Sequence, residues 1–159
     1  MSDWRIRRGE IRDVATLTAF NRAMAAETED LALDEAVVRA GVQGLIEHPE
    51  YGFYLLAESD TDGVLGSLMV TYEWSDWRDG LIWWLQSVYV CPEARRRGVF
   101  RALYRAVRQE ALDAGARGLR LYVERHNHSA RNTYRQLGMS DSDYLLLEAL
   151  FDAGSTPAS

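Results

Sequence analysis

Residues 95–101, Arg-Arg-Arg-Gly-Val-Phe-Arg, join cationic side chains to a glycine where a long helix is predicted to begin. The first turn of a helix carries backbone N–H groups without helical partners and the positive end of the helix dipole, which together bind anions. Gly98 lets a phosphate approach the backbone closely, and the arginines add charge-assisted donors. The segment therefore predicts a phosphate or pyrophosphate site, although a solvated basic loop has the same short pattern.

Several other nucleotide and cofactor chemistries are excluded by composition. All 18 basic residues are arginines, so a phosphate-loop lysine, a pyridoxal Schiff base and a lysine nucleophile are impossible. No G-x-G-x-x-G of a dinucleotide fold is present. The net charge of −6 argues against a nucleic-acid partner and permits a cationic substrate.

Two weaker patterns leave alternatives open. Cys91 with His126 or His128 could serve a cysteine hydrolase or acyltransferase, but no sequence feature marks a base beside the cysteine. The two histidines have neither cysteine partners nor a third ligand, so we expect no bound metal.

The location and domain content follow from the same composition. A chain of 159 residues, 47% hydrophobic and 26% charged, predicts one globular domain, which we place over 1–152 with a frayed tail over 153–159. A single cysteine fits a reducing compartment. The N-terminus has no apolar signal core, and no apolar run approaches the ~20 residues of a membrane span. We therefore expect a cytoplasmic protein without a membrane partner.

Hydrophobic periodicity predicts the elements that position these residues. Strands are predicted over 3–8, 51–58, 64–74, 81–90, 119–124 and 144–150, and helices over 10–26, 34–47, 98–114 and 127–137. Asp34 and Asn127 are expected as helix N-caps, and Gly115 as a C-terminal cap. The expected fold is α/β (α+β), with a mixed, mostly antiparallel central sheet of about six strands flanked by four helices, in the order β-α-α-β-β-β-α-β-α-β.

The stretch 88–103 resembles the acetyl-coenzyme A motif of the GNAT superfamily of N-acetyltransferases, a strand followed by [Q/R]-x-x-G-x-[G/A] at a helix start. Arg95 matches the first position and Gly98 the glycine, whereas Phe100 replaces the usual Gly or Ala. Residues 121–139 resemble the family's following strand, its N-x-x-A-x-x-x-Y helix and the glycine that ends it. The two motifs stand in the family's order, and together with the matching order of predicted elements the similarity covers most of the chain.

The resemblance implies acetyl-CoA as the cofactor, with its pantetheine arm bonded to strand backbone like an extra strand. The Val88 N–H is the implied donor to the thioester oxygen, the N–H groups of 96–101 would hold the pyrophosphate, and Asn127 would bond the pantetheine or the distal region. The implied cofactor residues are Ser87, Val88, Tyr89, Val90, Arg95, Arg96, Arg97, Gly98, Val99, Phe100, Arg101, Asn127 and Tyr134.

Tyr134 is the implied catalytic acid that protonates the leaving thiolate. A thiol has a pKa of about 8.5 and tyrosine one of about 10, so the transfer is predicted to be nearly matched. The alternative role for Tyr134 is a core aromatic on one face of its helix.

The acceptor side is less specific. Some polyamine-acetylating relatives carry a glutamate at the position that matches Gln86. A glutamine side chain cannot take a proton, which argues against a direct base at this position. Other carboxylates could act as a base through water, and exposed tryptophans could hold a cation. The acceptor-side candidates are Glu27, Glu29, Glu73, Trp74, Trp77, Gln86 and Glu124.

The resulting expectation is an N-acetyltransferase that moves an acetyl group from acetyl-CoA to a primary amine of a small molecule, by direct attack in a ternary complex. A protein or peptide amine as acceptor, and a non-catalytic acyl-CoA sensor on the same fold, are the alternatives. The sequence leaves the oligomeric state open between a monomer and a homodimer, and many relatives of the family dimerise.

Overall fold

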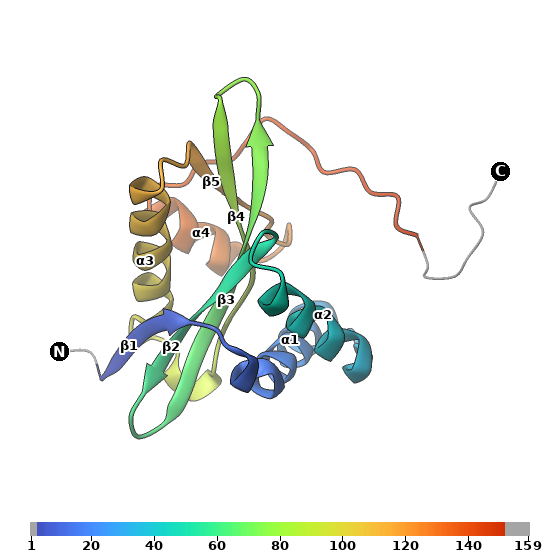
Figure 1. The fold of residues 1–159 in the computed structure, drawn as a ribbon, viewed down its shortest axis with the longest axis vertical. Coiled ribbons are helices and arrows are strands. Elements are labelled where there is room, and N and C mark those ends of the chain that lie inside the picture. The colour runs from blue at the N-terminus through green and yellow to red at the C-terminus, as the bar shows by residue number, and fades with distance from the viewer. Residues whose placement is uncertain (1–2, 152–159) are drawn as a thin grey trace. The chain divides into compact units, whose positions relative to one another are not determined.

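Five strands form one sheet in the order β1-β2-β3-β4-β5 (Figure 1). They are β1 (Trp4–Arg8), β2 (Gly52–Ser59), β3 (Gly63–Ser75), β4 (Gly80–Val90) and β5 (Gly118–Leu121). β1 to β4 pair antiparallel and β5 pairs parallel to β4, so the predicted mixed, mostly antiparallel sheet is confirmed.

The computed structural model describes residues 3–151. These residues fall into two compact units, one that ends at Tyr122 and one that begins at Val123. The first unit contains the whole sheet and three helices. One domain over 1–152 stays a prediction, and the tail predicted over 153–159 lies outside the described residues.

Four α-helices form where the 3.6-residue period predicts them. They are α1 (Val14–Glu29), α2 (Glu35–Glu47), α3 (Val99–Asp113) and α4 (His128–Gln136), with a short 3-10 turn before α1. Asp34 caps α2, since its Oδ1 accepts a hydrogen bond from Val37 N–H at 3.0 Å. Gly115 follows α3 with φ 77°, as a C-terminal cap requires.

The helices of the first unit cover both faces of its sheet (Figure 1). On one face, α1 and α2 bury an apolar cluster against β2, made of Val14, Leu17, Val42, Leu45, Tyr54 and Leu56. On the other face, α3 buries Val99, Leu103, Tyr104, Val107 and Ala111. β4 lies between β3 and β5 in this sheet, and α3 follows it in the chain after a short 3-10 turn over Pro92–Ala94.

The sixth strand predicted over 144–150 is wrong, because within residues 3–151 this segment pairs with no strand. Its apolar run is compatible with a strand, but a strand forms only where another strand supplies hydrogen-bond partners, and periodicity does not identify that partner. The fifth strand also ends earlier than predicted, at Leu121.

Candidate active site

β4 carries a bulge three residues before its end. Between Gln86 and Tyr89, two residues of β4 lie opposite the single residue Leu68 of β3. Ser87, the first of the two, has φ 50°, in the left-handed region that non-glycine residues rarely adopt. Such a bulge bends the strand and disrupts its ladder, and β5 pairs with β4 only up to Leu85. The last five residues of β4 therefore extend beyond their parallel neighbour.

The backbone N–H groups in this part of β4 alternate between the two edges of the strand. Cys91 N–H, just past the strand, donates to Leu65 O of β3 at 2.8 Å. By alternation from Cys91, the N–H group of Val90 faces the opposite edge, which β5 does not reach, and Val88 lies within the bulge at the same end of β4. This edge can therefore donate to a ligand that lies along it like another strand.

The start of α3 is shaped by Gly98, its N-cap, which has φ 87°. A Cβ added at Gly98 would meet no atom within 4 Å, so the space beside this backbone is open. The first hydrogen bond of the helix runs from Ala102 N–H to Gly98 O at 3.0 Å. Arg96 also has a positive φ, of 64°. The loop and the first helical turn thus form the concave backbone that suits a phosphate.

Gly66 of β3 is a positioning residue that sequence reasoning missed. A Cβ at this position would lie 2.8 Å from Tyr89 O and 3.2 Å from Val99 Cγ1. Gly66 therefore lets β3, the end of β4 and the start of α3 approach closely. A glycine inside a predicted strand is the signal that could have indicated this contact.

Arg95, the first position of the motif, is held by two partners. Its Nη2 lies 2.7 Å from Glu27 Oε2, and its Nε donates to Val90 O at 3.0 Å. Tyr89 Oη also donates to Glu27, at 3.3 Å. The hydrogen bond to Glu27 raises the pKa of Arg95. Glu27, predicted on the acceptor side, thus lies next to two predicted cofactor residues, whereas Glu29 is an exposed residue at the end of α1.

The remaining motif residues have aromatic neighbours. The Arg97 guanidinium carbon lies 5.7 Å from the ring centroid of Trp4. Phe100 is half-buried, and its ring centroid lies 6.3 Å from that of Tyr104. The bulk of Phe100 therefore packs along α3, whereas Arg101 is exposed beside it.

Two acceptor-side candidates on the sheet already have polar partners. Gln86 Nε2 donates to Thr71 Oγ1 at 2.6 Å. Glu73 accepts from Trp84 Nε1 at 2.8 Å and from Arg120 Nη1 at 2.7 Å. Because the Glu73 carboxylate is already bonded to two side chains of the sheet, these contacts favour a structural role for it.

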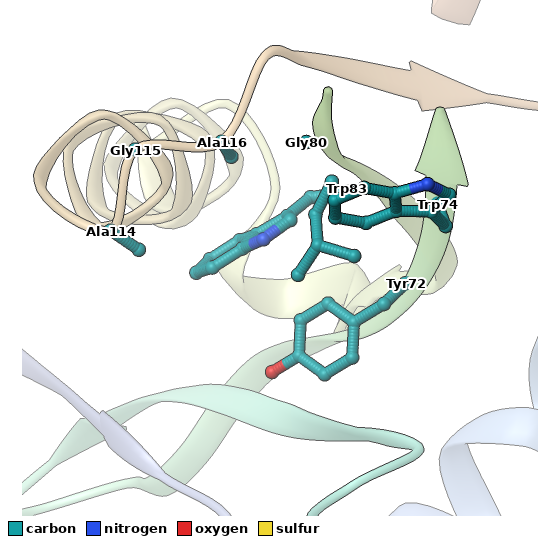
Figure 2. Close-up of a pocket in the computed structure, with 8 residues that line it drawn as sticks. Tyr72, Trp74, Gly80, Trp83, Ala114, Gly115 and Ala116 are labelled. Carbon is teal, nitrogen blue, oxygen red and sulfur yellow. The ribbon is translucent and has the colours of Figure 1, made fainter. Parts of the chain in front are cut away.

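Trp74 lines a cavity of about 320 Å³, together with Tyr72 and Trp83 (Figure 2). The cavity also touches 114–116, which follow the last turn of α3. The 15 residues of α3 place that end about 22 Å from Gly98. The cavity thus lies far from the predicted pyrophosphate site. Trp77 is 83% exposed in the β3–β4 turn and is not part of the cavity wall.

In the second unit, the predicted N-cap of the last helix is confirmed. Asn127 Oδ1 accepts a hydrogen bond from Ala130 N–H at 3.1 Å, at the start of α4. Glu124 Oε2 accepts from His126 N–H at 2.8 Å. The carbonyl oxygen of Asn127 is thus used by its own helix, and its amide N–H₂ is the group that remains for a ligand.

Tyr134 lies on α4 and is half-buried. Burial raises the pKa of Tyr134 to about 12. Its phenol is therefore protonated at neutral pH, as a proton donor must be. The raised value widens the pKa difference between Tyr134 and a thiol, whose pKa is about 8.5. The nearly equal pKa values expected for the two groups are therefore not found in this structure.

Cys91 lacks the features of an activated nucleophile. Burial raises the pKa of its thiol, and its Sγ donates weakly to Val64 O at 3.7 Å. Catalytic cysteines instead have lowered pKa values. Across residues 3–151, no three His, Cys, Asp or Glu side chains gather as a metal site would require. In the same range, no helix is both long enough and apolar enough to cross a membrane.

The fold has a bulged strand before a helix that begins at a left-handed glycine, and comparison with known proteins gives the class and family to which it belongs. Residues 8–139 match the Acetyltransferase (GNAT) family. Bovine thialysine N-epsilon-acetyltransferase is 31% identical over 120 residues, which cover 72% of this chain and 69% of that protein. The chain belongs to the GNAT family and is an acyltransferase.

Solved structures agree with this assignment. The crystal structure of a possible acetyltransferase from Clostridium difficile 630 is 38% identical, with a TM-score of 0.87, over 96% of this chain and 100% of that chain. A predicted acetyltransferase from Clostridium acetobutylicum, solved with acetyl-CoA, has the same fold at 14% identity, with a TM-score of 0.75 over 91% of this chain and 96% of that chain. The family transfers acetyl groups from acetyl-CoA.

Proposed function

We propose that this enzyme transfers the acetyl group of acetyl-CoA to a primary amine of a small molecule, by direct attack within a ternary complex. One observation carries the proposal. The bulge at Ser87 and Val88 interrupts the β3–β4 ladder, and β5 pairs with β4 only up to Leu85, so the end of β4 has an edge that β5 does not cover. The helix start at Gly98 follows within a few residues.

Acetyl-CoA supplies the thioester that an amine attacks. The N–H groups of Val88 and Val90 bind along the pantetheine arm, and the Val88 N–H stabilises the negative charge that develops on the carbonyl oxygen. The backbone of 96–101 and the Arg95 guanidinium bind the pyrophosphate, because a helix start and a cation both favour that charge. Gly98 fits this role, since the space where a Cβ would stand is open.

A small amine as acceptor is supported by the bovine relative, whose name specifies thialysine, an amino acid with a terminal amine on its side chain. The acceptor must be neutral to attack, whereas an amine of pKa near 10 is mostly protonated at pH 7. A carboxylate that takes its proton through water remains a prediction. Glu27 is the acceptor-side candidate with contacts to predicted cofactor residues, through Arg95 and Tyr89.

Tyr134 is proposed as the acid that protonates the leaving thiolate. Its raised pKa keeps the phenol protonated throughout the neutral range. We also propose that the enzyme is cytoplasmic, because its single cysteine fits a reducing compartment.

An amine panel with acetyl-CoA, followed by free-thiol release, tests the reaction. We expect turnover with small amino acids or diamines that bear a terminal primary amine, and weaker turnover with peptides. In a thermal-shift comparison, acetyl-CoA should stabilise the protein and NAD and ATP should not. Binding of acetyl-CoA without thiol release on any amine would favour the acyl-CoA sensor, and no stabilisation by acetyl-CoA would overturn the cofactor assignment.

A further inference from the structure

The cavity beside Trp74 is walled by residues of the first unit alone (Figure 2). Tyr72 pairs with Trp83 across β3 and β4, and Trp74 pairs with Leu81. Residues 114–116, which follow α3, form the other wall. At about 320 Å³, the cavity reaches the size range of small-molecule sites.

The cavity lies on the face of the sheet that points away from two acceptor-side candidates. Successive side chains of a strand alternate between faces, so Glu73 points away from the face that carries Trp74. Gln86 likewise lies on the opposite face from Trp83, three positions before it in β4. The length of α3 also places the cavity about 22 Å from Gly98. The cavity is therefore separate from the predicted pyrophosphate site and from these two candidates.

Trp83 brings an unpaired hydrogen-bond donor to this cavity. It is 6% exposed, and no hydrogen bond within residues 3–151 uses its indole N–H. The neighbouring Trp84 N–H, in contrast, donates to Glu73 at 2.8 Å. No fully buried side-chain nitrogen or oxygen in the described range lacks a partner. The Trp83 N–H must therefore reach open space, and the cavity is the space that Trp83 lines. A ligand with a hydrogen-bond acceptor would pair with this donor, as buried indole N–H groups usually do.

The surroundings of the cavity favour an uncharged ligand, because its wall contains no charged residue. Beyond the wall, Arg8 and Glu110 pair with each other at 2.6 Å. Arg117 passes over Gly80 and donates to Asp79 O at 3.4 Å. An indole N–H disfavours a cation, and the negative end of the α3 dipole disfavours an anion.

Three aromatic side chains in the wall favour a flat ring in the ligand. The ring centroids of Tyr72 and Trp83 lie 5.6 Å apart, with their planes at 65°. Trp74 is 62% exposed and makes no ring contact within residues 3–151, so its face is open to stacking. We propose that this cavity binds an uncharged aromatic molecule, with its ring against Trp74 and Trp83 and a hydrogen-bond acceptor on the Trp83 N–H.

N-methylbenzamide is the probe, because it has one ring, a carbonyl acceptor and no amine to acetylate. It is added to the isotope-labelled full chain, and NMR follows the indole N–H peaks of the five tryptophans, assigned by through-bond experiments. The Trp83 peak should shift to a saturable limit, with a Kd of about 1 mM or tighter. A Trp83 peak that does not move at about 10 mM probe overturns the proposal.

Relatives of the probe test the class of ligand. Benzoate and benzylammonium carry the same ring with a negative and a positive group, and both should bind at least about 5-fold more weakly, because neither charge has a partner in the wall. N-methylcyclohexanecarboxamide, which lacks the flat ring, should also bind more weakly. Charged relatives that bind as tightly as the probe contradict an uncharged ligand, and a cyclohexane relative that does so contradicts recognition of the ring.

Variants of the wall test the position of the bound probe. Trp74→Ala should weaken probe binding about 10-fold, whereas Trp77→Ala, on an exposed tryptophan outside the cavity, should leave it unchanged. Ala114→Phe, at an exposed position, should fill the cavity and abolish binding. Circular dichroism checks that each variant is folded. Probe binding that survives both Trp74→Ala and Ala114→Phe overturns the proposal.

Acetyl-CoA distinguishes this cavity from the proposed cofactor site. Saturating probe should change the Kd of acetyl-CoA by less than about twofold, and so should Ala114→Phe, since about 22 Å of helix separates the two sites. Competition between the probe and acetyl-CoA would assign the probe to the cofactor site and overturn the proposal. Probe binding by a chain that does not bind acetyl-CoA would contradict the cofactor assignment alone and would support the aromatic site.

Discussion

Arg95 Nη2 lies 2.7 Å from Glu27 Oε2 across 68 residues of sequence. The contact joins the last turn of α1 to the loop that opens α3. Both side chains are more than 40% exposed, so the pair contributes little to stability. The pair instead fixes the position of the Arg95 guanidinium. It lies beside Val90, where the pantetheine arm is proposed to pass.

Arg95→Ala is expected to raise the KM for acetyl-CoA about 10-fold, since a charge-assisted contact to the pyrophosphate is lost. The free energy of unfolding should change by less than about 1 kcal/mol, because the pair with Glu27 is exposed. Steady-state kinetics and urea unfolding measure the two effects. Arg22→Ala, which removes a comparable exposed pair with Glu35, is the control. An unchanged KM in Arg95→Ala would contradict a role in cofactor binding.

Gly98→Ala should impair acetyl-CoA binding more than it impairs folding. Its φ of 87° costs a non-glycine residue about 1–2 kcal/mol of folding free energy, whereas its Cβ would occupy space proposed for a phosphate. Gly63→Ala is a matched control, with φ 74° and an equally open Cβ position in the β2–β3 turn. Isothermal titration with acetyl-CoA and thermal melting compare the variants. Equal acetyl-CoA affinities in the Gly98→Ala and Gly63→Ala variants would contradict a phosphate site at Gly98.

Tyr134→Phe is expected to lower kcat by about 100-fold or more and to leave acetyl-CoA affinity nearly unchanged, as the loss of a proton donor would. Tyr51→Phe, on an exposed tyrosine, should have no effect. Because burial raises the pKa of Tyr134 to about 12, the phenol stays protonated, and its ionisation should produce no basic limb in kcat below pH of about 11. A limb below pH 10 that vanishes in Tyr134→Phe would refute this account of the tyrosine.

The Arg7–Asp13–Glu58 contacts predict how stability depends on pH. Burial alone would raise the pKa of Asp13, but hydrogen bonds from Arg7, at 2.8 Å, and from Glu10 N–H hold it below its usual value. The bond from Arg7 likewise lowers the pKa of Glu58. A lowered folded-state pKa stabilises the fold above the unfolded-state value, and this contribution is lost as the pH falls through the folded-state value.

Asp13→Asn should therefore cost about 2 kcal/mol of unfolding free energy at pH 7, because it leaves a half-buried arginine with one fewer carboxylate. The cost should shrink as the pH falls below about 4, because the carboxylate becomes protonated there in the unfolded state and, at still lower pH, in the folded state. Urea unfolding between pH 3 and 7 measures it. Asp60→Asn, whose partner Arg5 is exposed, should change stability by less than about 1 kcal/mol. A constant difference between wild type and Asp13→Asn across this range would contradict the linkage.

The helices and caps that carry the candidate site could be predicted from sequence because their signals are local. The period of α3, the left-handed glycine at its start and the caps at Asp34 and Asn127 depend on residues a few positions apart. The two GNAT motifs are likewise continuous segments, so their order along the chain was sufficient to indicate the family.

Only the tertiary structure decided the features that depend on pairing between distant segments. The positive φ at Ser87 follows from two residues of β4 facing one of β3, and the position of Glu27 follows from how the end of α1 lies beside β4 and the loop after it. Residues 144–150 were predicted as a strand because their side chains suit one. Hydrophobic pattern determines which segments can be covered, whereas backbone hydrogen bonding to a distant strand determines whether one forms.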